Sequence, residues 1–180
     1  MDNFIVIPPS PELSELSVKL GFTRLLCIER DFLVLDAQSP SEILHGISKA
    51  QGKLILYHPH DEDMLRYVLE KTPLKFVFSP ETMFPKDSVH FVRGGLNQIL
   101  CKIAAEKGKT IVFSFHDLLQ ATSQGFIIAR MMFNIKLCQK YKVRMLLSTF
   151  AREKMELRAA HDVLALWRVL GGKGPEELTL

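Results

Sequence analysis

Residues 32–63 read FLVLDAQSPSEILHGISKAQGKLILYHPHDED, and this segment is the clearest indication of the fold class. The runs 32–36 and 53–57 are short and apolar, which predicts two strands that are covered on both faces. Between them, Ser39 and Glu42 have capping-box spacing, and Pro40 stands at the first helical position, where a missing N–H costs nothing. We therefore expect a strand, a helix through about residue 50, and a second strand parallel to the first.

The same alternation of short apolar runs and helical segments continues along the chain. Strands are predicted at 3–7, 24–28, 32–36, 53–57, 75–78, 110–115 and 145–149, and helices at 11–20, 40–50, 61–70, 97–107, 123–141 and 161–170. This order predicts an α/β protein, but periodicity is compatible with both an open doubly wound sheet and a closed barrel. With 180 residues and 47% hydrophobic content, residues 1–180 are expected to form a single domain. An eight-unit barrel usually takes about 250 residues, so a barrel here would be compact or incomplete.

Cysteine spacing and hydropathy exclude several classes of protein. Cys27, Cys101 and Cys138 are widely spaced with no C-x-x-C pair, which predicts buried free thiols in a reducing compartment and no thiolate zinc site. The apolar run at 1–7 has no basic flank before it and no small-residue cleavage site after it, so we expect no secretory signal. No run approaches the roughly 20 apolar residues that cross a bilayer, so a soluble protein is expected.

The segment 57–63, YHPHDED, is the sharpest candidate for chemistry. His58 and His60 follow a predicted strand and could supply two imidazoles to zinc, manganese or iron, with carboxylates completing the site. A polar loop in which Asp61 caps the next helix explains the same residues. Because no second His/Asp cluster follows, we expect no metal, and His58 and His60 stand as the candidates if one binds.

A second polar pair, His116 and Asp117, follows the predicted strand 110–115. The two residues could form an acid–base pair or cap a helix. Ser114 stands in no G-x-S-x-G context, and Gly94 and Gly95 form no phosphate-binding loop. A serine hydrolase and a nucleotide cofactor are therefore not expected.

Charge divides the chain into two unlike halves. Residues 1–90 hold 9 Lys/Arg and 13 Asp/Glu, a net charge of −4, whereas residues 91–180 hold 14 and 7, a net charge of +7. A basic half suits a phosphate-rich partner, although a solvated surface of mixed charge gives the same totals. The cations that could follow a phosphate backbone are Lys86, Arg93, Lys102, Lys136, Lys140, Lys142, Arg144, Arg152, Lys154 and Arg158.

Several stretches of the second half carry a family resemblance. They are KDSVHFVRGGLNQILCKIA at 86–104, TIVFSFHDLL at 110–119, MMFNIKLCQKYKVRMLLSTF at 131–150, and the closing segment with Glu156, Leu157, Arg158, Asp162 and RVLG at 168–171. Together they resemble ribonuclease P protein component 3, a subunit shared by archaea and eukaryotes. Upstream, the agreement is mainly in the order of strands and helices.

The resemblance implies a distorted barrel of the triosephosphate isomerase type, distantly related to metal-dependent phosphoesterases. In this family, the RNA of the holoenzyme performs the Mg²⁺-dependent hydrolysis that removes 5′ leaders from precursor tRNA. The protein, paired with component 2, supports that RNA. The implied partners are ribonuclease P RNA, component 2 and, indirectly, precursor tRNA, in the cytoplasm or in a eukaryotic nucleus. No catalytic residue and no cofactor are expected in this chain.

The resemblance also implies functional positions. The residues that match family motifs are Lys86, His90, Arg93, Asn97, Lys102, Asp117, Arg158 and Asp162, of which the cations are expected to contact RNA. Family members often have Arg or Ser at the position of His116, which weakens a role for that histidine. Two other hypotheses stay open: a metal-dependent phosphoesterase that acts alone, and a barrel that binds only protein.

Overall fold

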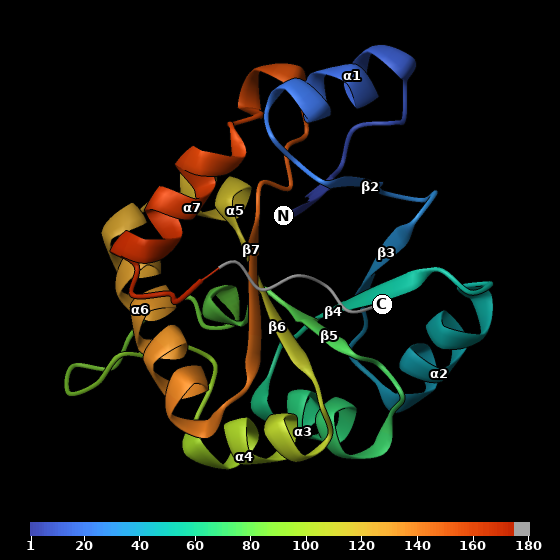
Figure 1. Ribbon diagram of the computed structural model, residues 1–180. Helices are drawn as coiled ribbons and strands as arrows, with labels where there is room; N and C mark the ends of the chain where they lie inside the picture. The colour runs from blue at the N-terminus through green and yellow to red at the C-terminus, as the bar shows by residue number, and fades with distance from the viewer. Residues whose placement is uncertain (175–180) are drawn as a thin grey trace.

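The computed structural model describes residues 1–174, in which strands and helices alternate as predicted (Figure 1). The strands are β1 (Asp2–Ile5), β2 (Arg24–Cys27), β3 (Phe32–Asp36), β4 (Leu54–His58), β5 (Phe76–Phe78), β6 (Thr110–Ser114) and β7 (Arg144–Ser148). The helices are α1 (Pro11–Lys19), α2 (Pro40–Lys49), α3 (Glu62–Lys71), α4 (Gln98–Glu106), α5 (Phe115–Gln120), α6 (Gln124–Tyr141) and α7 (Ala160–Val169), with 3₁₀ turns η1 (Pro80–Thr82) and η2 (Lys154–Glu156). The end of the predicted 1–180 domain, 175–180, lies outside the described residues.

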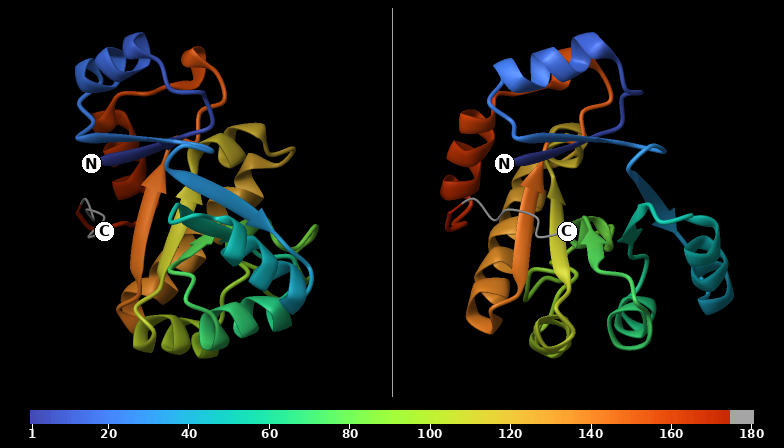
Figure 2. Two further views of the ribbon diagram at one scale, coloured as in Figure 1. Left: turned by 90° about the vertical axis from the view of Figure 1, so that its right-hand side faces the viewer. Right: turned by 45° about the vertical axis from the view of Figure 1, so that its right-hand side comes forward.

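The described strands form two parallel sheets. β3 to β7 make a five-stranded sheet in chain order, and β1 and β2 make a separate pair (Figure 2). Single parallel bridges join the pair to the larger sheet, Ile5 to Ala151 beyond β7 and Ile28 to Phe32 in β3. A doubly wound sheet reverses its strand order at a switch point, so the unbroken order of β3 to β7 excludes that alternative. The α/β prediction is confirmed.

Both faces of the strands are covered. One apolar cluster takes a side chain from every strand and one residue beyond β7: Phe4, Leu26, Phe32, Leu56, Phe76, Val112, Leu146 and Phe150. The adjacent strand positions, among them Tyr57, Val77 and Ile111, pack in a second cluster with the helices that lie around the strands (Figure 1). Burial on both faces explains why the strands read as continuous apolar runs.

Helix starts follow the local chemistry. The side chains of Ser10, Ser39 and Asp61 accept hydrogen bonds from the backbone N–H groups three residues ahead, at the first turns of α1, α2 and α3. In α2, the Glu42 carboxylate accepts from the N–H of Gln38, one residue before the position that a standard capping box uses. The predicted caps are thus present, with this one shift.

Helix α5 was not predicted. Its N-cap is Ser114, whose hydroxyl accepts from the N–H of Asp117 at 3.0 Å, so β6 ends one residue before the predicted 110–115 strand. The helix has only six residues, which is too short for a helical period to be read from the sequence. The polar pair after β6 therefore lies in the first turn of a helix.

The three cysteines lie in the interior of the protein. Cys27, Cys101 and Cys138 are buried and form no disulfide, which confirms their assignment as small core residues. Within residues 1–174, no helix combines the length and the apolar character that a membrane crossing requires.

Candidate functional site

A cleft of about 970 Å³ lies at the carboxyl ends of the strands of the larger sheet. Its lining includes Asp36 and His58, the last residues of β3 and β4, together with Asp117 after β6 and Arg152 after β7. Lys86, from the segment that follows β5 and η1, lines it as well. Parallel α/β proteins bind ligands at this end of the sheet, because loops from successive strands converge there.

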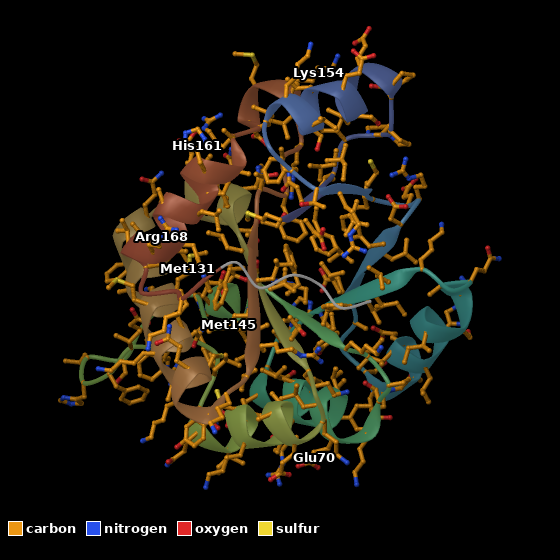
Figure 3. The ribbon with its side chains drawn as sticks, in the orientation of Figure 1. Glu70, Met131, Met145, Lys154, His161 and Arg168 are labelled. Atoms are coloured by element: carbon orange, nitrogen blue, oxygen red, sulfur yellow. The ribbon has the colours of Figure 1, made fainter. Side chains whose placement is uncertain are left out.

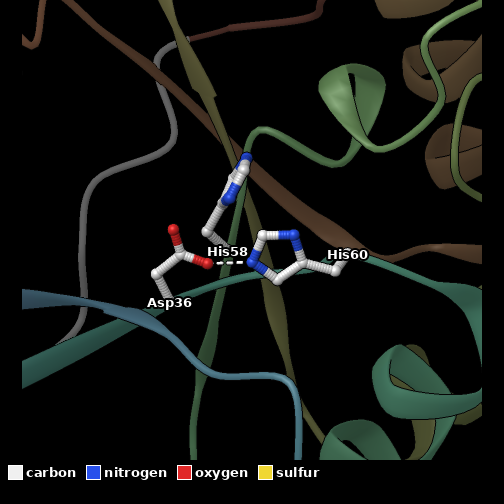
Figure 4. A group of neighbouring side chains, drawn as sticks. All are labelled: Asp36, His58 and His60. Atoms are coloured by element: carbon white, nitrogen blue, oxygen red, sulfur yellow. Dashed lines mark hydrogen bonds and ion pairs between the residues drawn. The ribbon is translucent and has the colours of Figure 1, made fainter.

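Asp36, His58 and His60 lie together at the ends of β3 and β4 (Figure 4). Each offers one ligand atom, and these atoms lie within 4.8 Å of one another. His60 Nε2 pairs with the Asp36 carboxylate, and the two imidazole rings stand edge to face with centroids 5.5 Å apart. The sequence pointed to the two histidines and missed Asp36. The signal for it is the strand register, in which Asp36 of β3 lies opposite His58 of β4.

A threonine orients the His58 ring. Thr82 Oγ1 lies 2.9 Å from His58 Nε2 and donates its own proton to the Ser79 carbonyl at 2.8 Å. The hydroxyl oxygen must therefore accept from His58 Nε2–H, which leaves Nδ1 with the free lone pair. Burial lowers the pKa of His58 below 6.5 and outweighs the nearby Asp36 carboxylate, which raises it. The neutral imidazole is thus favoured at neutral pH.

His116 and Asp117 have different partners, so no hydrogen bond of an acid–base pair joins them. Asp117 accepts from the Ser79 hydroxyl at 2.6 Å, at the edge of the cleft. The buried His116 ring lies 3.0 Å from Glu156, which also accepts from the backbone N–H of Arg152. His116 therefore supports the segment that carries Arg152.

Arg130 of α6 holds the segment after β5 in place, a role that no pattern in the sequence indicates. Its buried guanidinium donates to Asp87 at 2.8 Å and to the carbonyls of Glu81 and Phe84 at 3.0 and 2.7 Å. The Glu81 carboxylate is fully buried and has no hydrogen-bond partner among the described residues. Burial raises the pKa of Glu81 to about 8.

Four of the predicted RNA-binding cations line two neighbouring hollows. Lys86 and Arg152 are exposed and lie in the cleft. Arg93 and Lys140 line a second hollow of about 490 Å³ together with Asn97. The two hollows share Phe84, and the Arg93 guanidinium lies over its ring at 5.1 Å and over the Phe91 ring at 5.9 Å.

The other predicted cations lie elsewhere. Lys142 and Arg144 are at the start of β7, the opposite end from Arg152, and the Arg144 guanidinium donates to the Gly108 carbonyl. Lys154 lies beside α1, where it pairs with Glu12 at 2.8 Å (Figure 3). Three further residues are Lys102 on the exposed side of α4, Lys136 on α6, and the half-buried Arg158, which donates to the carbonyls of Met155 and Leu157.

The polar positions of the family motif are also dispersed. Asn97 caps α4 by accepting from the N–H groups of Ile99 and Leu100, and its amide donates to Glu62. His90 is exposed in the segment before it. Asp162, exposed on α7, pairs with His161 at 2.9 Å. Of the four, only Asp117 lines the cleft.

The fold and the cleft define a parallel α/β protein whose candidate site lies at the carboxyl ends of its strands. Its fold is similar to that of a chain in the cryo-EM structure of archaeal ribonuclease P with mature tRNA, with a TM-score of 0.69, 18% identity, and coverage of 95% of this chain and 73% of that chain. The crystal structure of an uncharacterized protein matches with a TM-score of 0.50 and 10% identity over 89% of this chain and 42% of that one. At these identities the likeness concerns the fold alone.

Curated sequences similar to this chain share one name. No family model matches the chain. Ribonuclease P protein component 3 of Methanococcoides burtonii is 30% identical over 149 residues, 80% of this chain and 58% of the relative. The same component of Methanosarcina barkeri is 30% identical over 146 residues, 78% of this chain and 57% of the relative. These components are therefore homologues of the chain, as its motifs predicted, and the chain spans little more than half of their length.

Proposed function

We propose that this chain is a protein subunit of ribonuclease P that supports the catalytic RNA in removing 5′ leaders from precursor tRNA. The observation that carries the proposal is the family relationship over four fifths of the chain. The geometry adds that Lys86 and Arg152, far apart in sequence, line one cleft. In this proposal the hydrolysis belongs to the holoenzyme RNA and its Mg²⁺, and the chain contributes no catalytic residue.

The RNA-binding surface that we propose extends from the cleft across Phe84 to the second hollow. Its cations are Lys86, Arg152, Arg93 and Lys140, and Phe91, 60% exposed, lies beside them. Cations that neutralise phosphates and an aromatic ring that can stack on a base are the usual components of an RNA interface. Of the other predicted cations, Lys102, Lys136 and Arg158 line neither hollow. Lys142 and Arg144 lie at the other end of β7.

The other proposed partners follow from the family. They are ribonuclease P RNA, protein component 2 and, indirectly, precursor tRNA, with no membrane involved. The proposed compartment is the cytoplasm, or the nucleus if the source is eukaryotic.

The proposed architecture is one compact, distorted barrel of seven strands. Two features support it: the apolar cluster that draws on all seven strands, and the parallel bridges between the β1–β2 pair and the larger sheet. A polar junction adds to them, because Asn3 Oδ1 in β1 accepts from the Ser148 hydroxyl at 2.8 Å and from the Thr149 N–H at 3.0 Å, at the end of β7. Closing a sheet in this way removes its exposed edges.

Cleavage of precursor tRNA across a magnesium titration tests the proposed function. The cognate ribonuclease P RNA is assayed with component 2 alone and then with this chain added. We expect a lower magnesium requirement and faster cleavage on addition, and no cleavage when the RNA is omitted. No change on addition would contradict the proposal.

A metal-dependent phosphoesterase that acts alone is the second candidate, and the group Asp36, His58 and His60 at the cleft favours it. It predicts cleavage of precursor tRNA by the chain with Zn²⁺ or Mn²⁺ in the absence of ribonuclease P RNA. It also predicts that His60→Ala abolishes that cleavage. Absence of activity without RNA would leave the subunit role as the better explanation.

A further inference from the structure

We infer that Asp36, His58 and His60 bind a divalent transition-metal ion, for which Zn²⁺ is the best match. The expectation of no metal rested on the lack of a third ligand near the two histidines. The fold supplies one, since the ligand atoms of all three residues lie within 4.8 Å of one another (Figure 4). Two metal–ligand bonds of about 2 Å each let one ion join ligand atoms up to about 4 Å apart, so one ion can reach all three atoms after a small adjustment.

The ligand set selects the class of ion. Two imidazole nitrogens and one carboxylate suit zinc, iron or manganese, whereas Mg²⁺ and Ca²⁺ prefer sites made of oxygen ligands. Three protein ligands also leave a coordination position for water. Asp36 and His58 line the cleft, so this position can face it.

The backbone holds the three ligands in place without the ion. Asp36 and His58 are opposite each other in the β3–β4 register, and the buried Pro59 between the two histidines restricts the backbone there. Ligands carried on paired strands need little reordering when an ion binds. The site is therefore expected to bind metal in the folded protein and not only as it folds.

The hydrogen bond to Thr82 orients the His58 ring, which would bind the metal ion. A metal-binding histidine usually donates its second N–H to a fixed acceptor, which sets the tautomer and the direction of the lone pair. Thr82 Oγ1 fills that role at 2.9 Å from His58 Nε2, and its own proton is committed to the Ser79 carbonyl. Nδ1 of His58 is thus the ligand atom in our proposal.

Calorimetric titration of Zn²⁺ into the chelator-treated full chain tests the site. We expect one ion per chain, and His60→Ala should weaken binding by more than roughly 100-fold. His161→Ala is the matched control, because this exposed histidine on α7 lies outside the group and its loss should leave the affinity unchanged. Thr82→Val keeps all three ligands and should weaken binding by about tenfold.

A second readout keeps the test decisive if an alanine variant folds poorly. Co²⁺ bound by two imidazoles and a carboxylate gives a visible absorption spectrum, which Asp36→Asn should alter and His161→Ala should not. Absence of Zn²⁺ binding by the wild-type chain would overturn the inference, and so would unchanged binding in both His60→Ala and Asp36→Asn. These measurements contain no RNA, so their failure is distinct from failure of the proposed subunit role.

Discussion

The two ends of the larger sheet differ in how their buried polar side chains are hydrogen-bonded. At the amino end, Lys109 is 4% exposed, and its ammonium donates to the carbonyls of Thr72 and Leu74 at 2.7 and 2.6 Å. At the carboxyl end, Glu81 is buried without a hydrogen-bond partner among the described residues, and Asp36, His58 and His60 gather beside a cleft. One end satisfies its polar groups with its own backbone, which serves stability. The other end gathers polar groups at a cleft, where parallel α/β proteins usually bind ligands.

The largest effect is expected from Arg130→Ala at the carboxyl end. The change leaves Asp87 and two carbonyls without their buried donor, which should lower the free energy of unfolding by about 4 kcal/mol. Urea denaturation measures this loss. Arg168→Ala, at an exposed position of α7, is the control and should stay within about 0.5 kcal/mol of wild type. Equal stability of the two variants would show that Arg130 does not anchor the segment after β5.

The next effect is a pH dependence carried by Glu81. Its pKa rises from 4.5 to about 8 on folding, so the folded state binds the proton more tightly and loses stability as pH rises through that window. From pH 5 to pH 8 this group should cost about 3 kcal/mol of unfolding free energy. Glu81→Gln should remove that part of the profile. The check is urea denaturation of both proteins at each pH, and parallel profiles would contradict the raised pKa.

A smaller loss is expected at the amino end. Lys109→Ala removes the donor to two buried carbonyls and should cost about 2 kcal/mol of unfolding free energy. Lys107→Ala, two residues earlier and exposed, is the matched control. If the two ends of the sheet act independently, the Zn²⁺ affinity should be the same in both variants. Weakened Zn²⁺ binding by Lys109→Ala alone would show that the ends are coupled.

The smallest change is expected in RNA binding, and it compares exposed cations at the two ends of β7. Lys86→Ala and Arg152→Ala should each lower the slope of log affinity against log salt by about one, the contribution of one phosphate contact. Lys142→Asn is the control at the other end of β7. Asparagine tolerates the left-handed backbone at that position, where φ is 59°, and the slope should not change. Filter binding to ribonuclease P RNA across a salt series distinguishes the ends, and equal slopes in all three variants would argue against the cleft surface.

The elements of the fold could be predicted from the sequence because their signals are local. Ser10, Ser39 and Asp61 begin helices through bonds to backbone groups three residues away, and each strand is a short apolar run between such signals. Helix α5 could not be predicted, because six residues directly after a buried strand show no period of their own. Strand order was also undetermined, since the same repetition fits two topologies.

The candidate site was only partly visible in the sequence. His58 and His60 are two residues apart and could be found together, but Asp36 joins them through the register of β3 and β4. Arg130 lies in a helix among other basic residues, and nothing in their pattern marks it as the buried one. Lys86 and Arg152 share a cleft, whereas Lys142 and Arg144, which looked equivalent, are at the opposite end of the sheet.

The strands, most of the helices, the buried thiols and the family resemblance could all be predicted from the amino-acid sequence, because each depends on residue types at short spacing. Which distant side chains meet depends on the tertiary structure. Strand register joins Asp36 to His58, and the direction of β7 separates Arg144 from Arg152. No local period encodes these contacts, because they arise only when the strands pair and the loops at one end of the sheet converge.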